Sequence, residues 1–130
     1  MSCVVDVVID TSVWIDALAG AKIQRIEDAL ADGSAVIPPI VIAELVTGAA
    51  SLAVREAIGE FLQETSIHDT PLEHWIDVGN LRRFLARKGL NVTVPDAHVA
   101  QCALDRDAIL LERDAIFAAI AKHTPLRLAR

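Results

Sequence analysis

Cysteine is scarce in this chain of 130 residues, which contains only Cys3 and Cys102 and no Cys-x-x-Cys pair. Two isolated thiols argue against a disulfide scaffold and a redox motif, so we expect buried free cysteines in a reducing compartment. The four histidines also lack the His-Glu-x-x-His spacing of a zinc hydrolase. Neither a redox centre nor a zinc site is therefore predicted.

A hydrophobic run long enough to cross a membrane is also missing, although 53% of the residues are hydrophobic. Residues 35–54 carry one charge, but Pro38, Pro39 and Gly48 interrupt the stretch, which predicts a buried turn and helix. The N-terminus shows neither the basic region nor the cleavage site of a signal peptide. We therefore expect a cytoplasmic protein with no membrane partner.

An excess of basic residues is absent as well, because the formal net charge is −6. A passive nucleic-acid binder usually carries a strong basic excess, so tight nonspecific binding is not expected. A nuclease remains compatible with this charge, because divalent cations partly neutralise its carboxylates.

The chain has no linker, low-complexity tract or internal repeat, and its length suits one compact domain spanning residues 1–130. Strands and helices are predicted to alternate along it, which favours a three-layer α/β domain with a mostly parallel central sheet flanked by helices. The predicted strands are 4–9, 35–37, 66–68, 108–111 and 126–129. The predicted helices include 13–18, 52–64, 71–88 and those beginning near residues 39, 95 and 114.

Several acidic residues fall where such a fold places its chemistry, beyond the carboxyl ends of the strands. Asp10 follows the first predicted strand, Asp114 follows the strand at 108–111, and Asp96 opens a helix. Helix capping is the commoner reason for an aspartate before a helix, so each residue also has an ordinary explanation. Glu44 either has a partner in its apolar stretch or points to water from one helix face.

Each of the four acids lies in a short segment with a distinctive pattern. The segments are Val8-Ile9-Asp10-Thr11-Ser12-Val13-Trp14-Ile15-Asp16; Ile42-Ala43-Glu44-Leu45 with Gly48; Pro95-Asp96-Ala97 with Val99, Ala100, Ala103 and Leu104; and Leu110-Leu111 with Asp114 and Phe117. They resemble the successive motifs of PIN domains, in order and spacing over nearly the whole chain. At this length the chain is most similar to the VapC-type toxins of bacterial toxin–antitoxin pairs.

The resemblance implies a metal-dependent ribonuclease whose metal-binding acids are Asp10, Glu44, Asp96 and Asp114. Thr11 or Ser12 would support the site through a hydroxyl group. Carboxylates brought together repel one another unless a cation lies among them, and oxygen-only ligands favour Mg²⁺ or Mn²⁺ over zinc. An RNA substrate, a cognate antitoxin protein and a homodimer are the partners that the resemblance implies.

An amphipathic antitoxin segment is expected to lie in a groove between apolar helices, with an arginine reaching into the acidic cleft. The alternative is that these apolar residues are ordinary core. The residues in question are Trp14, Leu18, Ile23, Ile26, Leu30, Leu52, Ile58 and Leu62.

A basic group, Arg82, Arg83, Arg87 and Lys88, lies near the end of the longest predicted helix. These side chains either hold RNA phosphates or form a solvated face that complements the helix dipole. Both tryptophans, Trp14 and Trp75, are predicted to be core residues.

Two positions depart from the PIN pattern. Glu112 stands where the family more often has Thr or Ser, which either removes a hydrogen bond or adds a fifth acid. His98 replaces a commonly apolar residue, and we predict that it lies on the helix surface, with substrate contact as the second possibility.

Three functions other than a metal-dependent ribonuclease are compatible with a small α/β domain. A haloacid-dehalogenase-type phosphotransferase needs a second aspartate at position 12, where Ser12 stands, and a receiver domain needs a lysine after the last strand, which Pro125-Leu126-Arg127 lacks. A catalytically silent PIN-like scaffold that binds RNA or protein is disfavoured because all four acids are present. A metal-dependent cleavage assay separates that case from a nuclease.

Overall fold

The protein is described by a computed structural model that covers residues 4–129. Within this range five strands form one sheet in the order β3-β2-β1-β4-β5, and every neighbouring pair is parallel. The strands are β1 (Val7–Ile9), β2 (Ala35–Ile37), β3 (Ser66–Ile67), β4 (Ile109–Leu111) and β5 (Arg127–Leu128). The predicted three-layer α/β fold is confirmed, although each strand except β2 is shorter than predicted.

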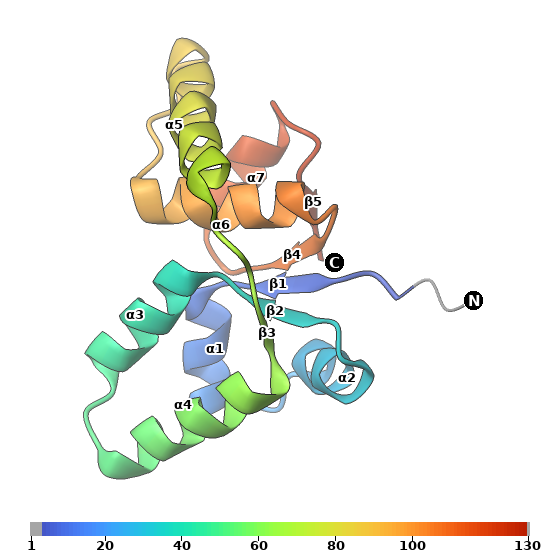
Figure 1. Cartoon of the computed structure of the whole chain (residues 1–130), viewed down its shortest axis with the longest axis vertical. Coiled ribbons are helices and arrows are strands. Elements are labelled where there is room, and N and C mark those ends of the chain that lie inside the picture. The colour runs from blue at the N-terminus through green and yellow to red at the C-terminus, as the bar shows by residue number, and fades with distance from the viewer. Residues whose placement is uncertain (1–3, 130) are drawn as a thin grey trace.

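Helices cover both faces of the sheet (Figure 1). The layer on one face contains α5 (Leu72–Arg87), α6 (Val94–Asp105) and α7 (Ala115–Ala121). The other layer contains α1 (Thr11–Leu18), α2 (Gln24–Asp32), α3 (Pro39–Gly48) and α4 (Leu52–Glu64). Within residues 4–129, no helix is both long and apolar enough to span a membrane.

Local sequence signals set where several helices begin and end. The Ser51 side chain accepts a hydrogen bond from the Val54 amide at 3.2 Å and caps α4. Thr93 caps α6 in the same way, accepting from the Asp96 amide at 3.3 Å. Gly33 ends α2 in the left-handed conformation, with φ of 77°, which a residue with a Cβ atom rarely adopts. These caps place Asp96 in the first turn of α6.

Burial corrects several predictions about individual side chains. His98 is completely buried, so its predicted place on the helix surface is wrong. Trp14 belongs to the core as predicted, but Trp75 is exposed and its ring stacks on His98 with centroids 4.8 Å apart. Cys102 is a buried free cysteine, as expected, while Cys3 lies outside the described residues.

Candidate active site at the carboxyl edge of the sheet

Asp10 occupies the centre of the sheet edge, directly after the buried strand β1. Its amide donates a hydrogen bond to the Leu111 carbonyl at 3.0 Å, which joins the carboxyl ends of β1 and β4. Asp10 is the residue before α1, yet its carboxylate does not cap that helix. Its Oδ2 atom instead accepts a hydrogen bond from the Ser12 hydroxyl at 3.1 Å. Helix capping therefore does not explain this buried carboxylate.

Glu44 is exposed on α3 and still has a specific partner. The Thr11 hydroxyl donates a hydrogen bond to Glu44 Oε1 at 2.8 Å, across 33 positions of sequence. The sequence left open whether Glu44 has a partner or points to water; its side chain is exposed, and it also has a partner. The contact also shows that the two hydroxyl residues following Asp10 hold two different carboxylates.

Asp114 and Glu112 shape the turn between β4 and α7. Asp114 Oδ1 accepts from the Ile116 amide at 3.0 Å, so the capping interpretation holds for one oxygen of Asp114. Glu112 Oε2 accepts from the Asp114 amide at 2.8 Å. Glu112 thus supplies a local hydrogen bond at this turn, which is the role that a Thr or Ser would also perform.

The charges of the four acids act on one another. Burial raises the pKa of Asp10 above its ordinary value, and the nearby charges of Asp96 and Glu44 raise it further, against hydrogen bonds from Thr11 and Ser12. Burial also raises the pKa of Asp96, with added repulsion from Asp114 and Glu44. Through these pairwise interactions all four acids are linked to one region of the sheet edge.

The acids are near one another without being packed together. Among the described residues, no three of these acids have carboxylate oxygens close enough together to share one ion. Ligand atoms within 4.8 Å of one another are found instead in a histidine–cysteine group on the α5–α6 side. Carboxylates in one region repel one another unless a cation lies among them. The donor set fits a hard divalent cation, since it offers oxygen atoms only and includes one buried carboxylate, Asp10.

The basic residues of α5 have mixed roles. All four are exposed, but the Arg82 Nε atom donates to the Val92 carbonyl at 2.8 Å and so braces the loop before α6. The Lys88 ammonium lies 5.5 Å from the centre of the Phe84 ring. Arg83 and Arg87 line a shallow pocket beside Phe84. We therefore regard Arg82 as a structural residue and Arg83 and Arg87 as the better candidates for substrate contact.

Sequence reasoning missed one ion pair near the site. Arg113 Nε donates to Asp16 Oδ2 at 2.8 Å and links α1 to the turn that carries Asp114. The two residues lie 97 positions apart, and no local pattern indicates that they pair.

An apolar groove adjoins Glu44, but not where the sequence placed it. Trp14, Ile26 and Ile58 are buried in the core, so they cannot line a binding surface. The groove lies between α1, α3 and α4. Its lining residues are Ile15, Leu18, Ala19, Glu44, Leu45, Gly48 and Val54.

Comparison with known proteins defines the class to which this fold and site belong. A family model of the PIN domain matches residues 7–123. The chain therefore belongs to the PIN domain family.

Several solved VapBC structures have a fold similar to that of this chain. The fold is similar to VapBC2 from Rickettsia felis bound to a promoter DNA fragment, with a TM-score of 0.79 and 22% identity over 95% of this chain and 96% of that one. The match to DNA-bound VapBC from Salmonella typhimurium has a TM-score of 0.79 and 23% identity, and covers 97% of this chain and 98% of that one. The match to VapBC-5 from Mycobacterium tuberculosis has a TM-score of 0.66 and 23% identity, and covers 98% of this chain and 99% of that one. A search of curated protein sequences finds no match.

Proposed function

We propose that this protein is a metal-dependent ribonuclease that acts in the cytoplasm as the toxin of a toxin–antitoxin pair. One observation carries the proposal: a buried carboxylate, Asp10, lies at the carboxyl edge of the sheet within the field of Glu44 on α3 and Asp96 on α6. Desolvated like charges are costly unless a cation neutralises them. The similarity to VapBC structures supports the toxin assignment.

Asp10, Glu44, Asp96 and Asp114 would hold Mg²⁺ or Mn²⁺. When bound, the ion supplies an activated water and stabilises the charge that develops at the phosphorus and the leaving oxygen. Thr11 orients Glu44, and Ser12 orients Asp10 through the hydrogen bonds described above. The rigid edge of the parallel sheet keeps these groups in place, which limits the reorganisation needed during reaction.

The groove beside Glu44 suits an antitoxin segment. Apolar side chains of an amphipathic helix would pack against Ile15, Leu18 and Val54, and an arginine from the same segment would reach the acids. The antitoxin would thereby place a positive charge where the metal ion is needed. We further propose a homodimer, for which α5 offers the exposed apolar side chains of Leu72, Ile76 and Phe84.

The experiment that tests the ribonuclease is cleavage of RNA by the purified full-length chain. We expect cleavage with Mg²⁺ or Mn²⁺, complete loss with excess chelator, and recovery when either ion is restored. Products with 5′-phosphate and 3′-hydroxyl ends are expected from the family resemblance. Cleavage that persists in chelator would contradict the mechanism, and no cleavage of any RNA with either ion would favour the silent scaffold.

The basic residues of α5 are tested by their effect on substrate binding. Replacing Arg83 and Arg87 together by alanine should raise KM with little change in kcat, and should make KM less dependent on salt. The fold should be unaffected because both side chains are exposed. Arg25→Ala, on α2, is the matched charge control. An unchanged KM in the double variant would remove these residues from the binding surface.

A further inference from the structure

A second group of metal-ligand side chains lies on the α5–α6 side of the sheet, away from the acids. One ring nitrogen of His68, one of His74 and the Cys102 sulfur lie within 4.8 Å of one another, and all three residues are buried. They come from the end of β3, the first turn of α5 and the last turns of α6. Within residues 4–129 no other group of His, Cys, Asp or Glu side chains is gathered so closely.

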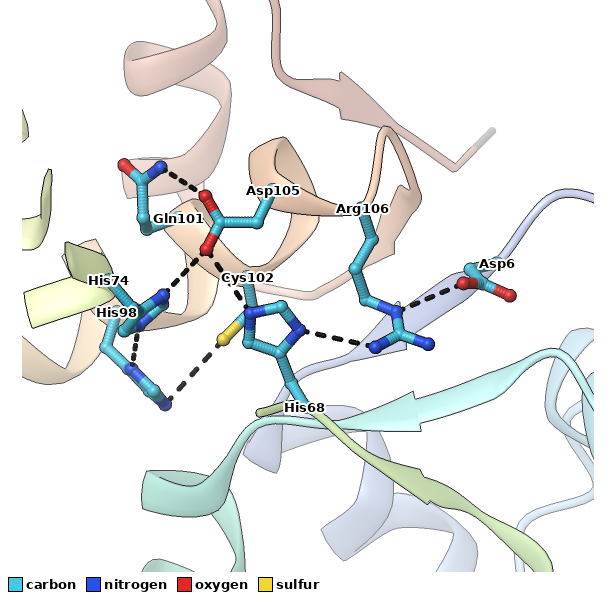
Figure 2. Close-up of polar contacts among 8 residues, drawn as sticks. All are labelled: Asp6, His68, His74, His98, Gln101, Cys102, Asp105 and Arg106. Carbon is cyan, nitrogen blue, oxygen red and sulfur yellow. Dashed lines mark hydrogen bonds and ion pairs between the residues drawn. The ribbon is translucent and has the colours of Figure 1, made fainter. Parts of the chain in front are cut away.

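Asp105 adds an oxygen to this group (Figure 2). Its Oδ2 atom lies 2.7 Å from His74 Nδ1 and 3.3 Å from His68 Nε2. Gln101 donates to the other oxygen at 2.8 Å and fixes the orientation of the carboxylate. The Asp105 side chain is 27% exposed, so the group has a path to solvent on this side.

Without an ion, the group is held by hydrogen bonds that run in one direction. The Ile40 amide donates to His98 Nε2 at 3.5 Å, so the proton of a neutral His98 is on Nδ1 and is donated to His74 Nε2 at 2.8 Å. The proton of His74 is then on Nδ1 and is donated to Asp105.

The chemistry of these side chains exceeds what a packed core needs. A buried histidine pair beside a carboxylate is a costly polar group, and core positions of this kind are usually apolar. Two imidazoles, a thiolate and a carboxylate are the donors that bind Zn²⁺ in a four-coordinate site. Loss of the thiol proton together with the carboxylate charge balances a dication, so the loaded site carries no net charge. A neutral site is the form that burial tolerates.

We propose that His68, His74 and Cys102, with Asp105 as the fourth ligand, form a binding site for Zn²⁺ or a similar transition-metal ion. The site is separate from the acids, because Asp96 and Asp105 lie at opposite ends of α6, about 14 Å apart at 1.5 Å per residue. Nitrogen and sulfur donors favour zinc-like ions, whereas the oxygen-only acids favour Mg²⁺ or Mn²⁺. The two sites therefore select different metals.

Protons balance when the ion binds. The Cys102 proton passes to His98 Nε2, the His98 proton passes from Nδ1 to His74 Nε2, and the His74 Nδ1 proton leaves to solvent. His98 Nε2 then carries a proton and no longer accepts from the Ile40 amide, so that hydrogen bond is released. His68 shifts its own proton from Nε2 to Nδ1. Its Nδ1 atom lies 3.4 Å from the Arg106 guanidinium, so Arg106 must release this contact. Arg106 keeps its other contact, the ion pair of its Nε atom with Asp6 Oδ2 at 3.0 Å.

The bound ion would join three parts of the chain. β3 is an edge strand of two residues, and the segment after it reaches α5 through His68 and His74. A shared ion fixes that segment against the last turns of α6. We therefore expect zinc binding to raise the thermal stability of the whole domain, since an ion that binds only the folded state stabilises it.

The test is titration of the metal-free full-length protein with Co²⁺, which reports coordination through its absorption spectrum. We expect one equivalent to give the intense visible bands of four-coordinate Co²⁺ and a sulfur-to-cobalt charge-transfer band. One equivalent of Zn²⁺ should remove both features and raise the melting temperature, whereas excess Mg²⁺ should do neither.

Matched variants separate this site from the rest of the chain. Cys102→Ser should lose the charge-transfer band and the rise in melting temperature caused by zinc, and His74→Gln should lose the four-coordinate spectrum. Cys3→Ser, the exposed His123→Gln and Asp10→Asn should retain all three signals. If His74→Gln fails to fold by circular dichroism, Cys102→Ser decides alone, because it replaces one atom by a smaller one. No bound Co²⁺ in the wild type, or unchanged bands in Cys102→Ser, would overturn the proposal and leave a hydrogen-bonded network.

Discussion

Asp10→Asn should abolish RNA cleavage while leaving the protein as stable as the wild type, or more stable, at neutral pH. The side chain keeps its shape but loses the charge that holds a divalent ion. Metal ions contribute several kcal/mol to phosphoryl transfer, and each 1.36 kcal/mol is a factor of ten, so we expect a loss of about 10³-fold or more. Cleavage rates at saturating Mg²⁺ and denaturant unfolding of both proteins without metal provide the two measurements.

The stability arm of this experiment has a defined dependence on pH. The pKa of Asp10 is raised in the folded state, so the metal-free wild type loses stability as pH rises from the ordinary value of 3.8 through the raised folded value. Asparagine carries no such charge, so the advantage of the variant should be present above that window and vanish below it. Ser51→Ala, which removes the cap of α4, is a control expected to cost about 1 kcal/mol without affecting cleavage. A variant that cleaves normally, or that is clearly destabilised at neutral pH, would contradict the assigned role of Asp10.

Ile15→Glu should weaken antitoxin binding by about 30-fold or more and leave RNA cleavage intact. Ile15 is 54% exposed at the groove, so the change does not disturb the core. A charged side chain at this position loses the apolar contact with the antitoxin helix, and a single anchor is worth about 2 kcal/mol or more. Binding is measured by calorimetry with the product of the neighbouring gene.

Ile67→Glu is the matched control, because Ile67 is 55% exposed but lies on the edge strand β3 and does not line the groove. It should bind the antitoxin as the wild type does. In a bacterial host, the Ile15 variant should arrest growth even when the antitoxin is produced. If the two variants bind the antitoxin with equal affinity, the antitoxin binds another surface, and the proposed nuclease activity is unaffected by that result.

The candidate acids could be chosen from the sequence because three of them, Asp10, Asp96 and Asp114, lie at recognisable element boundaries. Asp10 comes directly after an apolar β-branched strand, and Asp114 follows another, so the parallel arrangement brings them to the same edge. The exposure of individual side chains around the site could not be predicted from the sequence. Glu44 proved exposed, and the groove beside it involves Ile15 and Val54 instead of Trp14 and Ile58, because the rotation of α1 and α4 against the sheet depends on packing across the whole domain.

The histidine–cysteine group was not accessible in this way. His68, His74 and Cys102 show no motif spacing, and they converge only when α5 packs on α6 beside β3. No zinc site is predicted from the sequence, because zinc motifs are recognised by the spacing of ligands along one segment, and these ligands come from three. His98 was misplaced for a related reason: its partners are the Ile40 amide, 58 positions away, and His74, 24 positions away.

The central position of β1 in the sheet determines when the protein can fold during translation. β1 pairs with β4, whose residues emerge about a hundred positions later, and the Arg106–Asp6 contact spans 100 positions. Such long-range pairing cannot form while the first half of the chain is being made, and it slows folding once the chain is complete. Asp96 and Asp114 also arrive in the last third of synthesis. A nascent or truncated chain that carries only Asp10 and Glu44 therefore lacks an assembled acid cluster, and the acid site arises only when translation is nearly finished.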